Sequence, residues 1–337
     1  MSVRAVLIGL AVLATACAGE RPSVEEVADP TTTPSSTTTT SSATPTTTAP
    51  TTTTTTLPPG PIDGVAAPNG RQYPGVSTDP TEVAERIVEL ERLLRSTDPL
   101  DPAYGDLAHE QQMHYRHIGR NPEWLLTLWE AVPDDLFFTV ERHVSARQAI
   151  AGIPSGDPPV NVPAWEIIEP LPADELLVLY REASAATGID WEFLAAINLL
   201  ETGFGRIDGI STAGAQGPMQ FLPTTWEEVS DGDIRDPYDA IPAAARYLVR
   251  RGGPENMERA LWGYNNSDYY VSSVSAYAEL FRDDIANYYA AHQWEIHYSA
   301  AIGDLWLPVG YRSETSMPAA DYLETAPWSA PPSGATP

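Results

Sequence analysis

Apolar residues recur at helical spacing through most of this chain. After Asp79, which can cap a helix, Val83, Ile87, Leu90 and Leu94 follow one another at intervals of three or four residues. This spacing places the four side chains on one face of an α-helix. Similar patterns cover three further segments, residues 104–118, 122–131 and 134–150. Residues 79–150 are therefore predicted to form an all-helical segment.

A Pro-rich crossover, residues 151–171, separates this segment from a second helical part. Helical spacing then resumes, so residues 172–311 are predicted to form the main domain. Near its end, apolar residues flank Gly303-Asp304, a pattern that predicts a short β-hairpin within residues 294–311. The Ala-, Pro- and Ser-rich tail, residues 312–337, is predicted to be disordered. The expected fold class is mainly α.

The N-terminus carries a short apolar run behind Arg4. The run is too short to span a bilayer, which takes about 20 helical residues, and is typical of a secretion signal. Leu13-Ala14-Thr15-Ala16-Cys17 resembles the cleavage box of bacterial lipoproteins, in which small residues precede an obligatory cysteine. The resemblance implies that residues 1–16 are removed, that Cys17 is lipidated, and that the exported protein is anchored to the outer face of the cytoplasmic membrane. The alternative is an ordinary secretion signal with an incidental cysteine.

Residues 17–78 are predicted to be a lipidated N-terminus followed by a disordered tether. Residues 30–59 are almost entirely Thr, Ser and Pro. Such a stretch cannot bury enough apolar surface to offset the entropy of ordering it. The tether is therefore expected to let the folded part reach into the cell wall.

The charge balance excludes several function classes. The chain has 19 basic and 46 acidic residues, a formal charge of −27, and contains no lysine. A nucleic-acid partner is not expected, because phosphate binding needs clustered basic residues. Schiff-base chemistry and a P-loop lysine are also excluded. The single cysteine allows neither an internal disulfide nor a cysteine-based metal site.

The most informative segment begins at Asp190, a candidate N-cap, and ends at Gly203, a candidate stop. Between them a helix is expected from Trp191 to about Glu201, with Glu201 on the same face as its apolar residues. Burial and the negative end of the helix dipole both disfavour an anion there. Its pKa should rise, as a general acid near neutral pH requires. Taken alone, Glu201 could equally be an ordinary surface residue of the last turn.

Two later segments change this interpretation. Residues 211–226 form a Gly-rich turn with Met, Gln, Phe and Trp side chains that can contact sugar rings and acetamido groups. Residues 260–271 end a helix in the polar cluster Tyr264-Asn265-Asn266. Trp262, in the same segment, is expected in the core.

Glu-Thr-Gly-Phe-Gly at residues 201–205, Gly-Pro-Met-Gln-Phe at 217–221 and Tyr-Asn at 264–265 occur here in an order and spacing that resemble lytic transglycosylases. Those enzymes share a lysozyme-like catalytic domain and cleave bacterial peptidoglycan. The resemblance covers roughly residues 172–290 and is nearest to the membrane-bound B-type branch; residues 79–150 lie outside it, and their role is open. It implies that Glu201 is the single acid/base. It further implies substrate-binding roles for a set of six residues, Ser211, Met219, Gln220, Phe221, Tyr264 and Asn265.

One carboxylate is consistent with that chemistry. A lysozyme-type hydrolase needs a second carboxylate, whereas a transglycosylase uses the acetamido group and the C6 hydroxyl of its own muramyl substrate. The product implied is a 1,6-anhydromuramyl sugar, and the implied partner is the glycan strand of peptidoglycan. Two alternatives remain: a goose-type lysozyme-like hydrolase, and a catalytically silent glycan-binding or scaffold lipoprotein.

No cofactor or metal is expected. His109 and His114 are five residues apart, so they do not share a helix face as the histidines of zinc proteases do. Residues 231–236 resemble a calcium loop but lack its sixth-position Gly and closing Glu. The sequence identifies no protein partner.

Overall fold

The computed structural model describes residues 66–154 and 156–331. The predicted signal peptide, the lipidation site Cys17 and most of the tether lie outside this range, as does the end of the chain from residue 332. Within it, the protein is mainly helical, as the sequence predicts. No helix in the described ranges has both the length and the apolar character that crossing a membrane requires.

The N-terminal helical segment forms where helical spacing predicts it. The Asp79 carboxylate accepts a hydrogen bond from the Thr81 amide at 2.8 Å and so caps the first helix. The elements are α1 (Pro80–Ser96), α2 (Tyr104–Arg120), the 3-10 turn η1 (Pro122–Trp124), α3 (Leu125–Ala131) and α4 (Asp134–Gly152). Their apolar faces meet in a core that includes Ile87, Leu90 and Val140, all buried.

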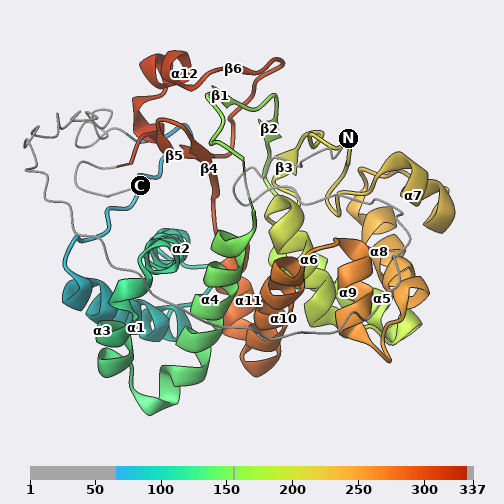
Figure 1. Cartoon of the computed structure of the whole chain (residues 1–337), viewed down its shortest axis with the longest axis horizontal. Helices are drawn as coiled ribbons and strands as arrows, with labels where there is room; N and C mark the ends of the chain where they lie inside the picture. The colour runs from blue at the N-terminus through green and yellow to red at the C-terminus, as the bar shows by residue number, and fades with distance from the viewer. Residues whose placement is uncertain (1–65, 155, 332–337) are drawn as a thin grey trace, which may run out of the picture. The chain divides into compact units, whose positions relative to one another are not determined.

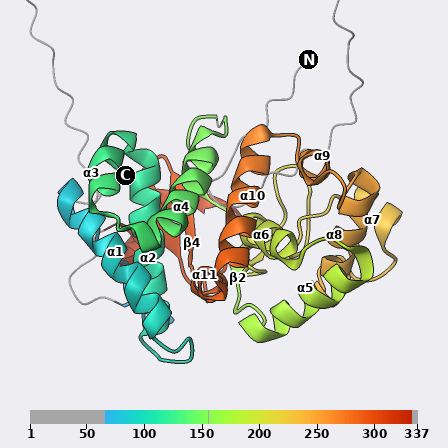
Figure 2. The same cartoon turned by 90° about the horizontal axis from the view of Figure 1, so that it is seen from below.

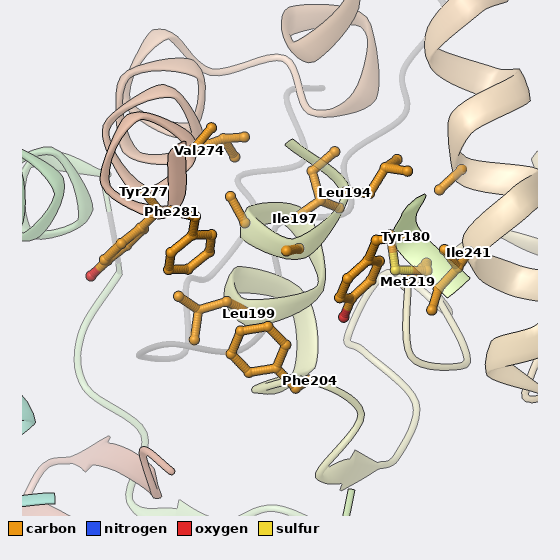
Figure 3. Close-up of a cluster of buried hydrophobic side chains, with 14 of the residues drawn as sticks. Tyr180, Leu194, Ile197, Leu199, Phe204, Met219, Ile241, Val274, Tyr277 and Phe281 are labelled. Atoms are coloured by element: carbon orange, nitrogen blue, oxygen red, sulfur yellow. The ribbon is translucent and has the colours of Figure 1, made fainter. Parts of the chain in front are cut away.

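The second helical part surrounds α6 (Trp191–Thr202). Its other helices are α5 (Ala173–Thr187), α7 (Pro223–Val229), α8 (Pro237–Arg251), α9 (Met257–Tyr264), α10 (Asp268–Asp283) and α11 (Ile285–His292). Figure 3 shows α6 between Val274, Tyr277 and Phe281 of α10 on one side and Tyr180, Met219 and Ile241 on the other. The helix that carries Glu201 is thus the centre of this core.

Helices α10 and α11 follow each other with one residue between them. Asp284 has an extended backbone between α10 and α11, and its carboxylate accepts a hydrogen bond from the Ala286 amide at 3.0 Å. A carboxylate in this position satisfies a free amide of a new helix. Asp284 therefore both ends α10 and caps the start of α11.

Three small antiparallel pairs accompany the helices. The predicted hairpin is confirmed as β4 (Ile296–Ala300) and β5 (Gly303–Leu307), with Tyr298 opposite Leu305. The Pro-rich crossover contributes one strand to each of the other two pairs. Strand β1 (Asn161–Val162) pairs with β6 (Met317–Pro318) of the tail, and β2 (Glu166–Ile167) pairs with β3 (Ile207–Asp208), which follows α6.

The prediction that the tail is disordered is wrong for its described residues. Beyond β6 it forms α12 (Ala319–Thr325) and the 3-10 turn η2 (Pro327–Ser329). Ala319 is fully buried, and the Ser329 hydroxyl donates to the Trp306 carbonyl at 2.7 Å. Small alanine side chains let the tail pack closely on the hairpin, although the segment is too short to show a helical period.

The predicted tether ends earlier than residue 78. Residues 66–78 run across the hairpin, and Tyr73 and Val76 are buried. The Tyr73 hydroxyl donates to the Asp304 carbonyl at 3.0 Å, and Arg71 pairs with Asp106 at 2.9 Å. The Tyr73 ring and the Arg71 side chain thus join this segment to the folded part, where the Thr-rich composition has ended.

Candidate active site

Glu201 lies in the last turn of α6. The helix stops at Gly203, whose backbone is left-handed at φ 62°, as the sequence predicts. Asp190 occupies the N-cap position, but its side chain makes no cap hydrogen bond and pairs instead with Arg282 at 2.9 Å. The carboxyl group of Glu201 is therefore at the carbonyl end of a helix whose apolar faces are buried.

The carboxyl group of Glu201 is almost completely buried, with 1% of the residue exposed. Its Oε1 accepts a hydrogen bond from the Tyr270 hydroxyl at 2.8 Å, and its Oε2 has no hydrogen-bond partner among the described residues. Burial raises the pKa of Glu201 to about 8, against a smaller lowering effect of the Tyr270 hydroxyl. At neutral pH this acid keeps its proton.

Tyr270 is brought to Glu201 by the start of α10. The Ser267 hydroxyl caps that helix by accepting a hydrogen bond from the Tyr270 amide at 3.4 Å. The Tyr264 ring lies parallel to the Tyr270 ring, with centroids 6.4 Å apart. Burial and the nearby Glu201 carboxylate raise the pKa of both phenols. Both tyrosines therefore remain neutral hydrogen-bond donors over the range in which Glu201 titrates.

The Gly-Pro-Met-Gln-Phe segment is fixed to the same helix. The carbonyl of Pro218 accepts hydrogen bonds from Asn198 Nδ2 at 2.8 Å and from the Thr202 hydroxyl at 2.6 Å. The Tyr264 hydroxyl donates to the Met219 carbonyl at 2.7 Å. The three sequence blocks that define the resemblance are thus joined by hydrogen bonds around the end of α6.

The predicted substrate-binding residues occupy different environments. The side chains of Met219 and Phe221 are buried in the α6 core, where Phe221 packs against Trp226 and Tyr247. Both side chains are therefore part of the core next to the turn, and their substrate-binding role stays a prediction.

Three other predicted residues place polar groups near the turn. The Ser211 hydroxyl accepts hydrogen bonds from the amides of Ala213 and Ala215 and so shapes the loop. Gln220 Oε1 and Asn265 Nδ2 are buried without a hydrogen-bond partner among the described residues. Buried polar atoms of this kind carry an energetic penalty that a ligand can relieve.

Sequence reasoning was wrong about Trp262 and missed Tyr270. Trp262 is 47% exposed rather than in the core. Tyr270 is the hydrogen-bond partner of Glu201. Its neighbour Tyr269 is also a tyrosine, and the sequence does not indicate which of the two faces the acid. The available signal is Ser267, a cap candidate that would have set the register of the helix.

The acidic residues that follow Glu201 most closely in the sequence lie on the surface. Asp208 in β3 is exposed and pairs with Arg235 at 3.3 Å, and Glu227 and Glu228 are exposed on α7. None of them shares the buried environment of Glu201. The site as described is built around one carboxyl group.

No group of three or more possible metal ligands occurs within the described ranges. The histidines that invite a metal interpretation have other contacts. His109 Nε2 is 2.8 Å from His297 Nε2, and His114 Nδ1 is 2.9 Å from the Glu110 carbonyl.

Comparison with known families adds one finding. Residues 179–285 match the family model described as "Transglycosylase SLT domain". The match begins within α5 and ends at the first residue of α11, so it contains Glu201, Met219, Tyr264 and Tyr270. It supports a peptidoglycan substrate and an activity of the lytic transglycosylase type. Searches of curated proteins and of solved structures found no match to this chain.

Proposed function

We propose that this protein is a peptidoglycan lytic transglycosylase with Glu201 as its only acid and base. It cleaves the β-1,4 bond between MurNAc and GlcNAc and leaves a 1,6-anhydromuramyl end. The observation that carries the proposal is the buried carboxyl group of Glu201, hydrogen-bonded to Tyr270, within the segment that matches the transglycosylase domain.

The first step uses the proton that Glu201 holds at neutral pH. Glu201 donates this proton to the glycosidic oxygen while the bond from that oxygen to C1 of MurNAc breaks. The acetamido group of the same sugar stabilises the positive charge that develops at C1. A pKa of about 8 suits this step, because a general acid works best when its pKa is near the operating pH.

The second step returns the proton. Glu201 is now a carboxylate, and it accepts the proton of the MurNAc C6 hydroxyl as that oxygen bonds to C1. The products are a free GlcNAc hydroxyl and an anhydro sugar, and no water is consumed. The Tyr270 hydroxyl, 2.8 Å from Oε1, stabilises the carboxylate between the two steps.

Substrate recognition is proposed for the polar atoms of the turn. Gln220 Oε1 and Asn265 Nδ2 are an acceptor and a donor without partners among the described residues, and an acetamido group needs both. Ser211, Met219, Phe221 and Tyr264 support these two residues from the loop, the core and the end of α9.

The location of the enzyme is proposed from the sequence alone. A lipidated Cys17 anchors the exported protein to the outer face of the cytoplasmic membrane, and the Thr-rich tether lets the enzyme reach the wall, as in the B-type branch.

The products of a digest test the proposal. Purified sacculi are incubated with the protein, and the soluble muropeptides are measured by mass. We expect anhydromuropeptides. Muropeptides heavier by one water would indicate a hydrolase, and the absence of soluble products would indicate a binding or scaffold protein.

A further inference from the structure

Helix α10 lies between two helices from different parts of the chain. It packs against α6, which carries Glu201, and against α4 of the N-terminal segment (Figures 1 and 2). Of all the described elements, α4 makes the most extensive contact with α10. Through α10, the N-terminal segment can therefore act on the site, although it lies outside the matched residues 179–285.

The contact between α4 and α10 runs along both helices. Arg142 Nη1 pairs with Glu279 Oε2 at 2.7 Å near one end. In the middle, the Ser273 hydroxyl lies 3.4 Å from the Ala146 carbonyl, and both residues are buried. Small side chains at these positions let the two backbones approach closely.

At the end nearest the site, the contact depends on Gly152. A Cβ atom added to Gly152 would lie 2.5 Å from Cε1 and 2.9 Å from Cδ1 of Tyr269. Gly152 is the last residue of α4 and its φ is not positive, so the backbone does not require glycine. The space that the Tyr269 ring occupies is therefore a reason for glycine at this position.

Tyr269 and Tyr270 are consecutive residues in the first turn of α10. Tyr269 rests on the end of α4, and Tyr270 donates its hydroxyl hydrogen to Glu201. A shift of this turn therefore moves both residues together. Hydrogen bonds weaken steeply with distance and angle, so a small shift is enough to detach Tyr270 from the acid.

We propose that Gly152 is a positioning residue, which seats Tyr269 on α4 and thereby sets the distance from the Tyr270 hydroxyl to Glu201. The N-terminal segment is on this account part of the catalytic unit. The inference rests on the proposed function for its meaning, because it assigns Gly152 a role in the acid/base step.

Gly152→Ala tests the inference. The matched control is Gly105→Ala, also in a helix of the N-terminal segment, where the nearest atom to an added Cβ is at 3.5 Å. The readout is the pH titration of the infrared carbonyl band of the Glu201 acid, assigned by its absence in Glu201→Gln. Among the described residues, Glu201 raises the pKa of the Tyr264 and Tyr270 phenols, and both stay neutral.

In Gly152→Ala we expect the carboxyl group to titrate at higher pH than in the parent, because the hydroxyl that stabilises its anion has moved away. We also expect kcat to fall by about tenfold, since misplacing a group by about 1 Å can cost up to 100-fold. Gly105→Ala should match the parent in both readouts. An unchanged titration in a folded Gly152→Ala protein would overturn the inference, since the Tyr269 ring would then have turned into solvent by itself.

Tyr269→Ala provides a second route if Gly152→Ala does not fold. Removing the ring takes away the three nearest atoms that the added Cβ would meet, so Gly152→Ala should have little further effect in the Tyr269→Ala background. Additive effects of the two changes would contradict the inference. The infrared titration does not depend on turnover. An inactive parent protein would therefore contradict the proposed function, whereas the titration would still test the role of Gly152.

Discussion

The Tyr270 hydroxyl and the Glu201 carboxyl group form a hydrogen bond of 2.8 Å in a place that is otherwise closed to solvent. A donor at this position stabilises the carboxylate more than the acid. Burial acts in the opposite direction and is the larger effect. The balance between them keeps the pKa of Glu201 near neutrality.

Tyr270→Phe should therefore move the alkaline limb of the pH profile of kcat/KM to higher pH. The variant loses the donor to Oε1 and leaves the burial of Glu201 intact, so its pKa rises further. It should also lower kcat, because the carboxylate formed in the first step is no longer stabilised. Initial rates of muropeptide release between pH 5 and 10 measure both effects. A limb that moves to lower pH would contradict this account of the pair.

The raised pKa of Glu201 also predicts how stability depends on pH. In the unfolded chain the group titrates near its ordinary value of 4.5, and in the folded protein near 8. Between these values the folded state holds a proton that the unfolded state has released, so stability falls as pH rises through this window. The loss is at most about 1.4 kcal/mol per pH unit. Glu201→Gln cannot titrate and should lose less stability than the parent between pH 5 and 8, as measured by denaturant unfolding.

Gly217 is predicted to be irreplaceable for a steric reason. Its φ is 73°, and a Cβ atom there would overlap the Ile234 carbonyl oxygen, which is backbone and cannot yield. Gly217→Ala should cost about 3 kcal/mol or more of unfolding free energy. Gly214→Ala is the matched control, with φ 87° but no atom within 4 Å of an added Cβ. It should cost only about 1–2 kcal/mol of backbone strain. Equal costs at the two positions would contradict the steric explanation.

Arg147 on α4 is predicted to destabilise the protein. It is 3% exposed, and Nε, Nη1 and Nη2 have no hydrogen-bond partner among the described residues. Burial lowers its pKa to about 10, so it remains charged at neutral pH. Its contact with the Trp294 ring, 4.9 Å from the centroid, offsets only part of the desolvation. Arg147→Met keeps the aliphatic stem and removes the charge, so it should raise stability by about 1–3 kcal/mol. A lower unfolding midpoint would show that the charge has a compensating partner.

The sequence predicted the elements that depend on local pattern. Helical spacing located the helices, Gly203 ended α6 and Gly303 marked the hairpin, because each is a property of adjacent residues. Contacts between distant segments could not be read in this way. The packing of α4 on α10 and the ordering of residues 317–329 depend on which surfaces meet.

The same distinction holds within the site. Glu201 and Tyr264 lie near each other, as the motifs that contain them suggest. Each motif lies at the end of a helix, so its place could be read from adjacent residues. Met219 and Phe221 were expected at the glycan, and their side chains lie in the core around α6. An apolar residue beside a glycine-rich turn can face either way, and only the packed structure decides between the two.

The rate of anhydromuropeptide release by Glu201→Gln tests the central claim most directly. The matched control is Glu192→Gln, the same substitution in the first turn of the same helix, where the carboxylate lies near Arg282. The account predicts a loss of about 100-fold to 10,000-fold for Glu201→Gln, as expected for removing a general acid and base, and near-parental activity for Glu192→Gln. Parental rates in the Glu201→Gln protein would contradict it.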